Sequence, residues 1–211
     1  MATRLNSIQH RITTVMSRLL VLALLAPAVS AFFLDSFGLG INTVTELDLP
    51  NYLGRWYQMY TSPSVLETFE KDALCVTADY SMSTDGSGRV IVRNGETLKT
   101  PDGTQKTING YAIPSDEPGK LTVDLETAPF PAPYWVIKLG PKTFGKDNQY
   151  EYSVVTDNLK ATLFVLARDP ETFNREYNEE VLEFLKKKGF TNFINKPVAT
   201  YQGSDCMYVN Q

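Results

Sequence analysis

Few side chains in this sequence could do chemistry. It contains one histidine, His10, and two cysteines, Cys75 and Cys206. Histidine is the usual general base and a common zinc or haem ligand, and a cysteine thiolate can act as a nucleophile. We expect the segment that holds His10 to be removed, so the mature chain would contain no histidine. This excludes Ser-His-Asp and Cys-His catalysis and His-ligated zinc or haem, and we expect no metal, no cofactor and no enzymatic activity.

The segment expected to be removed is residues 1–31, which have the order of a secretory signal peptide. Residues 1–18 hold three arginines and no acidic residue, and the apolar run LLVLALLA follows. This run is too short to span a bilayer, which takes about 20 residues. Small residues at Val29 and Ala31 then favour cleavage after Ala31 and a secreted protein. The alternatives are an uncleaved anchor and an organelle transit peptide.

The two cysteines of a secreted chain are most simply paired in one disulfide. A bond between Cys75 and Cys206 would close a loop of more than 100 residues. The chain-entropy treatment of such a loop gives a stabilisation of roughly 4–5 kcal/mol. The alternative is a reactive thiol at Cys75.

The charge of the mature chain limits its partners. Loss of residues 1–31 removes three of the 20 basic residues and none of the 24 acidic ones, which leaves a net charge of −7. Nucleic acids and anionic membrane surfaces both reward clustered lysine and arginine. We therefore expect neither a nucleic acid nor an anionic membrane surface as a partner. The apolar run in 1–31 is too short to cross a bilayer, so we also expect no integral membrane span.

Residues 54–168 read as eight short strands separated by turns. Apolar residues tend to alternate within the strands, and Gly, Pro, Asp and Asn gather between them. Regular strands without intervening helices favour a β-sandwich or an up-and-down barrel. Residues 173–190 change to a helical period, with Asn174 as the expected N-cap and Gly189 as the stop. The apolar stripe of this helix is narrow, so we expect it to pack outside the sheet.

Eight meandering strands followed by one helix resemble the element order of the lipocalin family. The segment GRWY at 54–57 matches the Gly-x-Trp motif of the first lipocalin strand, and LARDP at 166–170 supplies the family's arginine after the last strand. The segments LGRWYQMY, VTADYSM, APYWVI and VLARDP, with the cysteine pair, most resemble the apolipoprotein D and bacterial-lipocalin branch. The family's middle motif, Thr-Asp-Tyr, is replaced by KLGPKTFGKDNQY, so the resemblance does not predict the loop at 139–149.

The resemblance implies an all-β fold: an eight-stranded antiparallel up-and-down β-barrel over residues 48–206 with one C-terminal α-helix packed outside. Residues 32–47 would form a linker and 207–211 a tail. In the family the tryptophan lies across the closed end of the barrel and the arginine packs over it. Gly54, Trp56 and Arg168 are therefore assigned to barrel closure, where a desolvated cation–π contact contributes about 1–2 kcal/mol.

The strand period of two, together with the family pattern, predicts which side chains face the barrel interior. Trp56 and Arg168 set the phase of the first and last strands, and the middle strands are aligned to the family. A bulge would reverse the face that a strand presents. The expected ligand-binding residues are Gln58, Tyr60, Ala78, Tyr80, Val92, Asn94, Glu96, Ile108, Ala112, Leu121, Val123, Leu125, Tyr134, Val136, Thr162, Phe164 and Leu166.

Asn94 and Glu96 are polar exceptions in a wall that is otherwise mostly aliphatic and aromatic. On an inward face they would hydrogen-bond a ligand hydroxyl or keto group, whereas near the rim they would be solvated, and both alternatives are open. A buried, unpaired carboxylate is costly. Glu96 therefore either has a partner or faces water.

An apolar cavity with a few placed polar groups suits a small lipophilic ligand. The resemblance thus implies a secreted monomeric carrier of a fatty acid, lysolipid, sterol or retinoid-like molecule. One alternative is an extracellular interaction protein whose barrel is filled by its own side chains, namely Tyr60, Tyr80, Tyr134 and Phe164. The other is a lipocalin-fold enzyme that uses a free Cys75 or an acid such as Glu96 or Asp124.

Overall fold

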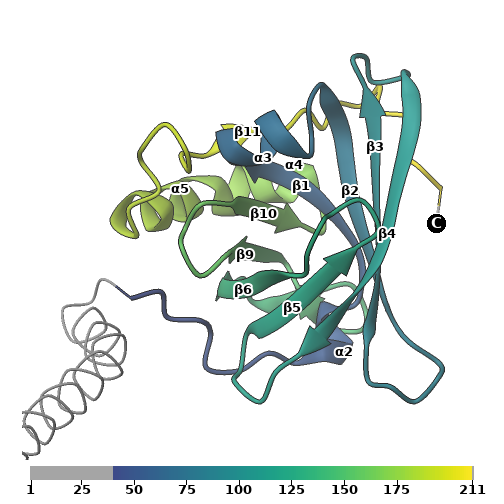
Figure 1. The fold of residues 1–211 in the computed structure, drawn as a ribbon. Helices are drawn as coiled ribbons and strands as arrows, with labels where there is room; N and C mark the ends of the chain where they lie inside the picture. Colours follow the sequence, from purple (N-terminus) through teal and green to yellow (C-terminus); the bar gives the residue numbers. More distant parts are fainter. Residues whose placement is uncertain (1–39, 211) are drawn as a thin grey trace, which may run out of the picture. The chain divides into compact units, whose positions relative to one another are not determined.

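The computed structural model describes residues 40–210, and the compact unit that holds the fold begins at Asn42 (Figure 1). The signal peptide predicted over 1–31 and most of the linker predicted over 32–47 lie outside the described residues. Within 40–210, no helix is long and apolar enough to cross a bilayer.

Eight antiparallel strands close into a barrel. The pairing follows the chain from β1 to β6 and continues through β9 to β10, and β10 then pairs with β1. This closure confirms the predicted eight-stranded up-and-down barrel. The strands are β1 (Gly54–Thr61), β2 (Ala73–Met82), β3 (Val90–Leu98), β4 (Thr104–Pro114), β5 (Lys120–Leu125), β6 (Ala132–Leu139), β9 (Tyr152–Thr156) and β10 (Leu163–Ala167).

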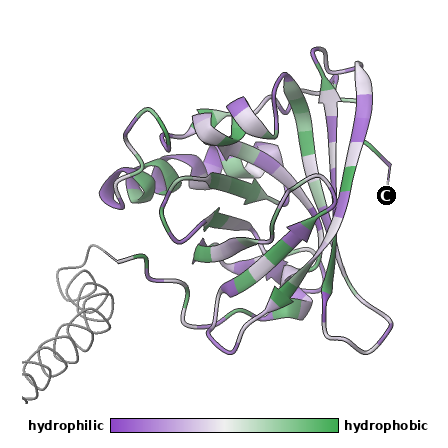
Figure 2. Ribbon diagram, viewed as in Figure 1, coloured by the Kyte–Doolittle hydropathy of each residue, from purple (hydrophilic) through white to green (hydrophobic). Residues whose placement is uncertain are grey.

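The alternation of apolar residues that predicted the strands also determines which side chains form the core. In β3, Val90 and Val92 are each 4% exposed, whereas Ile91 between them is 40% exposed. Figure 2 shows hydrophobic and hydrophilic residues interleaved along the strands. Because successive side chains of a strand point to opposite faces, one set builds an apolar interior and the other set meets solvent.

A helical segment packs on the outside of the barrel, as predicted, but it begins earlier than the sequence indicated. Asp169, not Asn174, caps it, because the Asp169 carboxylate accepts a hydrogen bond of 2.7 Å from the Thr172 amide. The segment stops where Gly189 takes the left-handed conformation, with φ +85°. It consists of α4 (Pro170–Thr172), the π-helical turn η1 (Phe173–Tyr177) and α5 (Asn178–Lys187).

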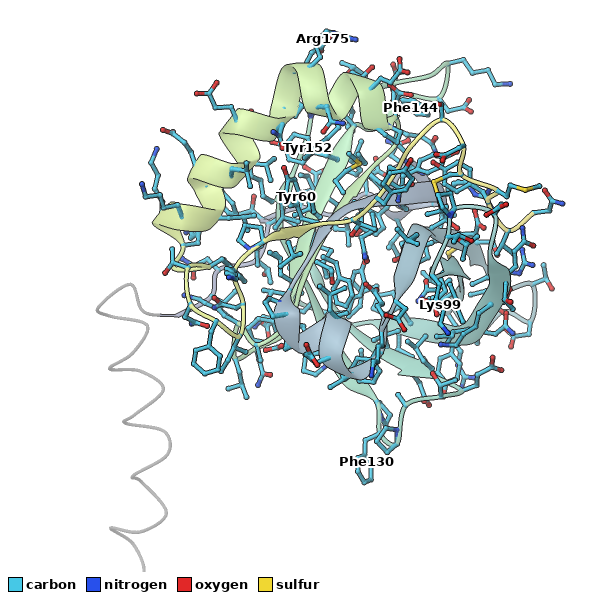
Figure 3. The ribbon with its side chains drawn as sticks, turned by 90° about the horizontal axis from the view of Figure 1, so that it is seen from above. Tyr60, Lys99, Phe130, Phe144, Tyr152 and Arg175 are labelled. Carbon is cyan, nitrogen blue, oxygen red and sulfur yellow. A yellow bond between two sulfur atoms is a disulfide. The ribbon has the colours of Figure 1, made fainter. Side chains whose placement is uncertain are left out.

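A β-bulge in β1 overturns one predicted inward residue, Tyr60. The register of β1 against β10 shifts between Gln58 and Tyr60, so the side-chain alternation reverses there. The Tyr60 hydroxyl donates a hydrogen bond of 2.7 Å to Asn178 Oδ1 of α5, and its ring lies 6.5 Å from that of Phe173. Figure 3 shows Tyr60 and Tyr152 between the barrel and the helical segment. Tyr60 therefore anchors the helix and does not face the interior.

The loop that lacks the family's middle motif packs against the start of β1. It forms a hairpin of β7 (Lys142–Phe144) and β8 (Gln149–Tyr150), beside the short helix α2 (Leu49–Tyr52). Gln149 Nε2 donates a hydrogen bond of 2.7 Å to the Leu53 carbonyl, and the Asp48 amide donates one of 3.1 Å to the Tyr150 hydroxyl. Contacts across the chain thus order a loop that the resemblance left open.

Trp56 and Arg168 meet at this end of the barrel. Trp56 is fully buried, and the guanidinium carbon of Arg168 lies 3.7 Å from the centre of its ring. Gly54 has φ +95°, and a Cβ there would lie 3.2 Å from Arg168 Nη1. Burial lowers the pKa of Arg168 to about 10. The guanidinium also donates hydrogen bonds to four backbone carbonyls, those of Asn51, Leu53, Arg55 and Tyr150.

The predicted disulfide between Cys75 and Cys206 is present in the structure. Cys75 has φ +52° and lies where the register of β2 against β3 shifts between Leu74 and Thr77. This bulge turns the first part of β2 away from β1, which β2 pairs only over Gly54–Tyr57. The disulfide therefore fixes the C-terminal segment to the bulged part of β2.

The C-terminal segment fills the gap between β1 and β2. Strand β11 (Val198–Ala199) pairs with Tyr60 and Thr61 of β1. The Gln202 side chain donates hydrogen bonds to the carbonyls of Gln58, at 3.0 Å, and Val76, at 2.8 Å, and so bridges the two strands. The barrel wall is thus completed by a segment that follows all eight strands in the sequence.

Replacing Arg168 with Ala should lower the free energy of unfolding by about 3 kcal/mol or more, because four carbonyls and the Trp56 ring lose their partner. Urea unfolding followed by circular dichroism measures the change. Arg175 is an exposed arginine of η1 (Figure 3). Its replacement with Ala should change the free energy by less than about 0.5 kcal/mol. Equal effects of the two substitutions would contradict this account of closure.

Candidate ligand-binding site

The barrel encloses a cavity of about 400 Å³ whose lining is mainly apolar. All eight barrel strands contribute to the lining. Residues of α3 (Pro63–Thr68), the loop that follows it and the β9–β10 loop complete the wall at the end opposite Trp56. The Ser64 hydroxyl of α3 donates a hydrogen bond of 2.5 Å to the Ala161 carbonyl, which joins helix and loop. The cavity therefore has one closed end and a mouth built from connecting segments.

Most of the residues predicted to face the interior line this cavity. The exceptions are Tyr60, which lies outside the barrel, and Val136, which is fully buried in the core beside the cavity. The predicted residues that line it are Gln58, Ala78, Tyr80, Val92, Asn94, Glu96, Ile108, Ala112, Leu121, Val123, Leu125, Tyr134, Thr162, Phe164 and Leu166.

The sequence reasoning missed the cavity residues that belong to α2, α3 and the loops. Tyr52 of α2 lies at the closed end, and Val65, Phe69 and Glu70 lie at the mouth. A period of two applies only within a strand, so it carries no information about these segments. No local signal distinguishes Glu70, because it stands in the segment LETFEKD with Glu67, Lys71 and Asp72 close by.

The closed end of the cavity has a floor of tyrosine hydroxyls. Tyr52 Oη lies 2.8 Å from Tyr134 Oη and 2.8 Å from Ser153 Oγ, and Tyr80 Oη lies 3.2 Å from Tyr134 Oη. Burial raises the pKa of Tyr52 to about 12, so the phenol is neutral at pH 7. Because each hydroxyl can donate and accept, the floor satisfies its own hydrogen bonds and still presents polar atoms to the cavity.

Nearer the mouth, Glu70 forms part of a polar cluster in the apolar wall. Gln58 Nε2 donates a hydrogen bond of 2.7 Å to Glu70 Oε2 and one of 3.1 Å to Thr200 Oγ1. Burial raises the pKa of Glu70 to about 7, and the negative charge of Glu96 acts in the same direction. The carboxyl of Glu70 is therefore close to half ionised at neutral pH.

Glu96 and Asn94 occupy the same face of β3, and the structure decides between the two alternatives for Glu96. It is 5% exposed, and its Oε1 accepts a hydrogen bond of 3.0 Å from Lys106 Nζ, so Glu96 is buried and has a charged partner. Asn94 lines the cavity, and its Oδ1 is buried without a hydrogen-bond partner among residues 40–210. Buried polar atoms are usually hydrogen-bonded, so Asn94 Oδ1 is an acceptor whose hydrogen-bonding capacity is unused.

A closed eight-stranded barrel with an internal apolar cavity and an external helix defines the class of protein. The family model described as the lipocalin-like domain matches residues 47–197. The chain therefore belongs to the lipocalin family.

Individual relatives lie in the apolipoprotein D and bacterial-lipocalin branch. The chain is 35% identical to apolipoprotein D of Macaca fascicularis over 186 residues, which is 84% of this chain and 89% of the relative. It is 28% identical to the outer membrane lipoprotein Blc of Escherichia coli over 177 residues, or 81% and 92% of the two chains. With apolipoprotein D of Mus musculus the match spans only 46% of the relative's length, at 36% identity over 44% of this chain.

A solved structure agrees in fold. The amine-binding protein of Rhodnius prolixus, in its tryptamine complex, superposes with a TM-score of 0.52 over 80% of this chain and 89% of that chain. At 19% sequence identity, this likeness concerns the fold alone.

The raised pKa of Glu70 makes the stability of the fold depend on pH. The ordinary value is 4.5 and the folded value about 7, so the contribution of the protonated carboxyl is complete below pH 4.5 and is lost as the pH rises through 7. The free energy of unfolding of the wild type, relative to Glu70→Gln, should fall by about 2 kcal/mol between pH 5 and pH 8.

Urea unfolding at both pH values measures this difference. Glu67→Gln is the matched control, because Glu67 is an exposed acid on the same short helix, α3. Its stability relative to the wild type should be almost the same at both pH values. A Glu70→Gln variant that behaved like this control would show that the Glu70 carboxyl is not withdrawn from water.

Proposed function

We propose that this chain is a secreted carrier that binds a small lipophilic molecule in its barrel cavity. The observation that carries the proposal is the cavity itself, about 400 Å³ in volume and mainly apolar in its lining. Ligand pockets commonly have volumes of about 300–1,000 Å³ and combine apolar walls with a few placed polar groups. The tyrosine floor and the cluster around Glu70 supply such groups at the two ends.

Membership of the lipocalin family supports a binding function, and so does the tryptamine complex of the Rhodnius prolixus protein, which has the same fold. The ligand classes that fit an apolar interior are fatty acids, lysolipids, sterols and retinoid-like molecules. We further propose that the lipocalin domain spans 48–206 and acts as a monomer.

The cavity argues against the alternative of a barrel filled by its own side chains. Tyr60, one of the residues that would fill it, lies outside, and Tyr80 and Tyr134 leave the cavity open above the floor. An interaction protein with a solid barrel is therefore less well supported than a carrier.

The residues that an enzyme would need have other partners. Cys75 is bonded to Cys206 and supplies no thiolate. Asp124 accepts a hydrogen bond of 2.8 Å from the Tyr111 hydroxyl, and Glu96 is paired with Lys106. Residues 40–210 hold no group of three or more His, Cys, Asp and Glu side chains that could bind a metal. These observations favour binding over catalysis.

Filling the cavity should abolish binding. Ala112 is 5% exposed and lines the cavity, so an Ala112→Trp substitution should lower affinity for the neutral fluorescent probe N-phenyl-1-naphthylamine at least tenfold. Ile113, the next residue of β4, is 45% exposed on the outside, and Ile113→Trp should leave affinity within about twofold of the wild type. Probe titration measures both, with circular dichroism to verify folding. Unchanged binding in a folded Ala112→Trp variant would place the probe outside the barrel.

Secretion is testable by expression of the full chain in a eukaryotic cell. The protein recovered from the medium should have the intact mass of a chain that begins at Phe32 with one disulfide, because cleavage is expected after Ala31. Native mass spectrometry of the same sample should also reveal any co-purifying molecule of a few hundred daltons. A chain that stays with the cells and keeps residues 1–31 would contradict secretion.

A further inference from the structure

The cavity contains acids but no bases. Its ionisable lining residues include Glu70 and Glu96 near the mouth and Asp157 in the β9–β10 loop, and the lining includes no Lys, Arg or His. Lys106 lies directly opposite Glu96 in the β3–β4 register, so it shares the face of Glu96 and pairs with it at the rim, where its side chain is 41% exposed. Glu96 is therefore neutralised as a pair, whereas Glu70 is hydrogen-bonded only to neutral groups, so the interior is neutral or negative.

This charge distribution opposes a ligand with a carboxylate. An anion that leaves water must find a cation or several donors, or its burial is costly. Here the carboxylate would approach Glu70 and Glu96, and like charges repel strongly where water is excluded. The tyrosine floor offers hydroxyl donors at the far end of the cavity, but the three hydrogen bonds among Tyr52, Tyr80, Tyr134 and Ser153 engage three of their four donor hydrogens.

The same region has spare hydrogen-bond acceptors. Asn94 Oδ1 is buried and accepts no hydrogen bond from residues 40–210. Glu70 and Glu96 are carboxylates with several acceptor sites each. Gln58 donates to Glu70 and Lys106 to Glu96, and the Thr61 hydroxyl also lies near enough to Glu70 to lower its pKa by hydrogen bonding. Asn94 and Glu96 are two residues apart on the inner face of β3, so these acceptors lie on one part of the wall. A group with several donors and a positive charge would complete this arrangement.

We infer that the cavity selects small apolar molecules that carry a protonated amine, and that the ammonium group lies beside Glu70, Glu96 and Asn94 with the apolar body against the aliphatic wall. An alkylammonium group has three N–H donors for these acceptors. It also supplies the positively charged partner that Glu70 lacks. The inference rests on the proposed carrier function and narrows its ligand to one chemical class.

The titration of Glu70 gives the inference a pH signature. The charged groups that face Glu70 are Glu96 of β3 and Lys106 of β4, and its pKa is about 7. An amine that is protonated at all pH values used would bind best to the ionised carboxylate. Amine affinity should therefore rise as the pH increases from 5.5 to 8, while the affinity of a neutral ligand should stay constant.

The test is calorimetric titration of the mature protein with three molecules of equal chain length: decylamine, decanol and decanoic acid. At pH 7.5 we expect decylamine to bind at least tenfold more tightly than decanol, and decanoate to bind at least tenfold more weakly than decanol. Glu70→Gln should remove most of the preference for the amine and leave decanol within about twofold. Glu67→Gln, an exposed change on α3, should alter none of the three affinities.

The possible outcomes distinguish a failure of the amine selectivity from a failure of the carrier function. Decanol binding with equal or weaker decylamine binding would overturn the amine selectivity and leave the carrier function standing. Tighter binding of decanoate than of decanol would also overturn it. If none of the three molecules, nor the neutral naphthylamine probe, bound to the folded protein, the carrier function would fail and the inference with it.

Discussion

The contact between Arg168 and Trp56 joins the first strand of the barrel to the segment after the last. The guanidinium is 4% exposed and has no carboxylate partner among its hydrogen bonds, which go to backbone carbonyls and leave its face on the indole ring. A buried charge survives only where dipoles and π-electrons replace water. The depth of the cavity also depends on this contact, because the ring of Tyr52, whose hydroxyl belongs to the floor, lies 5.2 Å from that of Trp56.

The barrel and most of its inner face were predictable because strand period and family pattern are local signals. Leu121, Val123 and Leu125 of β5 line the cavity as their alternation indicated. Tyr60 was not predictable, because a bulge leaves no distinct mark in the sequence and its position is fixed by contacts with the helix. Glu70 was missed because its role depends on a loop that folds over the mouth and brings it to Gln58.

Glu70 is not the residue that the stability of the fold alone would favour at this position. A carboxyl group in an apolar wall is costly when ionised, and a neutral glutamine of similar shape would avoid that cost at pH 7. Titratable groups with displaced pKa values inside a cavity are concentrated at functional sites. The chain places this group near the mouth of a mainly apolar cavity whose far end is a floor of neutral hydroxyls.

The C-terminal segment has a consequence for the order of biosynthesis. Thr200 and Gln202 hydrogen-bond to Gln58, so a polar residue of the cavity wall is held by residues translated after every barrel strand. Strands β1 to β10 can pair while the chain is still emerging from the ribosome, but the Gln58 side chain acquires its second partner, Thr200, only when translation has passed residue 200. Oxidation of Cys75 and Cys206 then locks that arrangement. The binding site is thus a late product of synthesis, finished after the barrel around it.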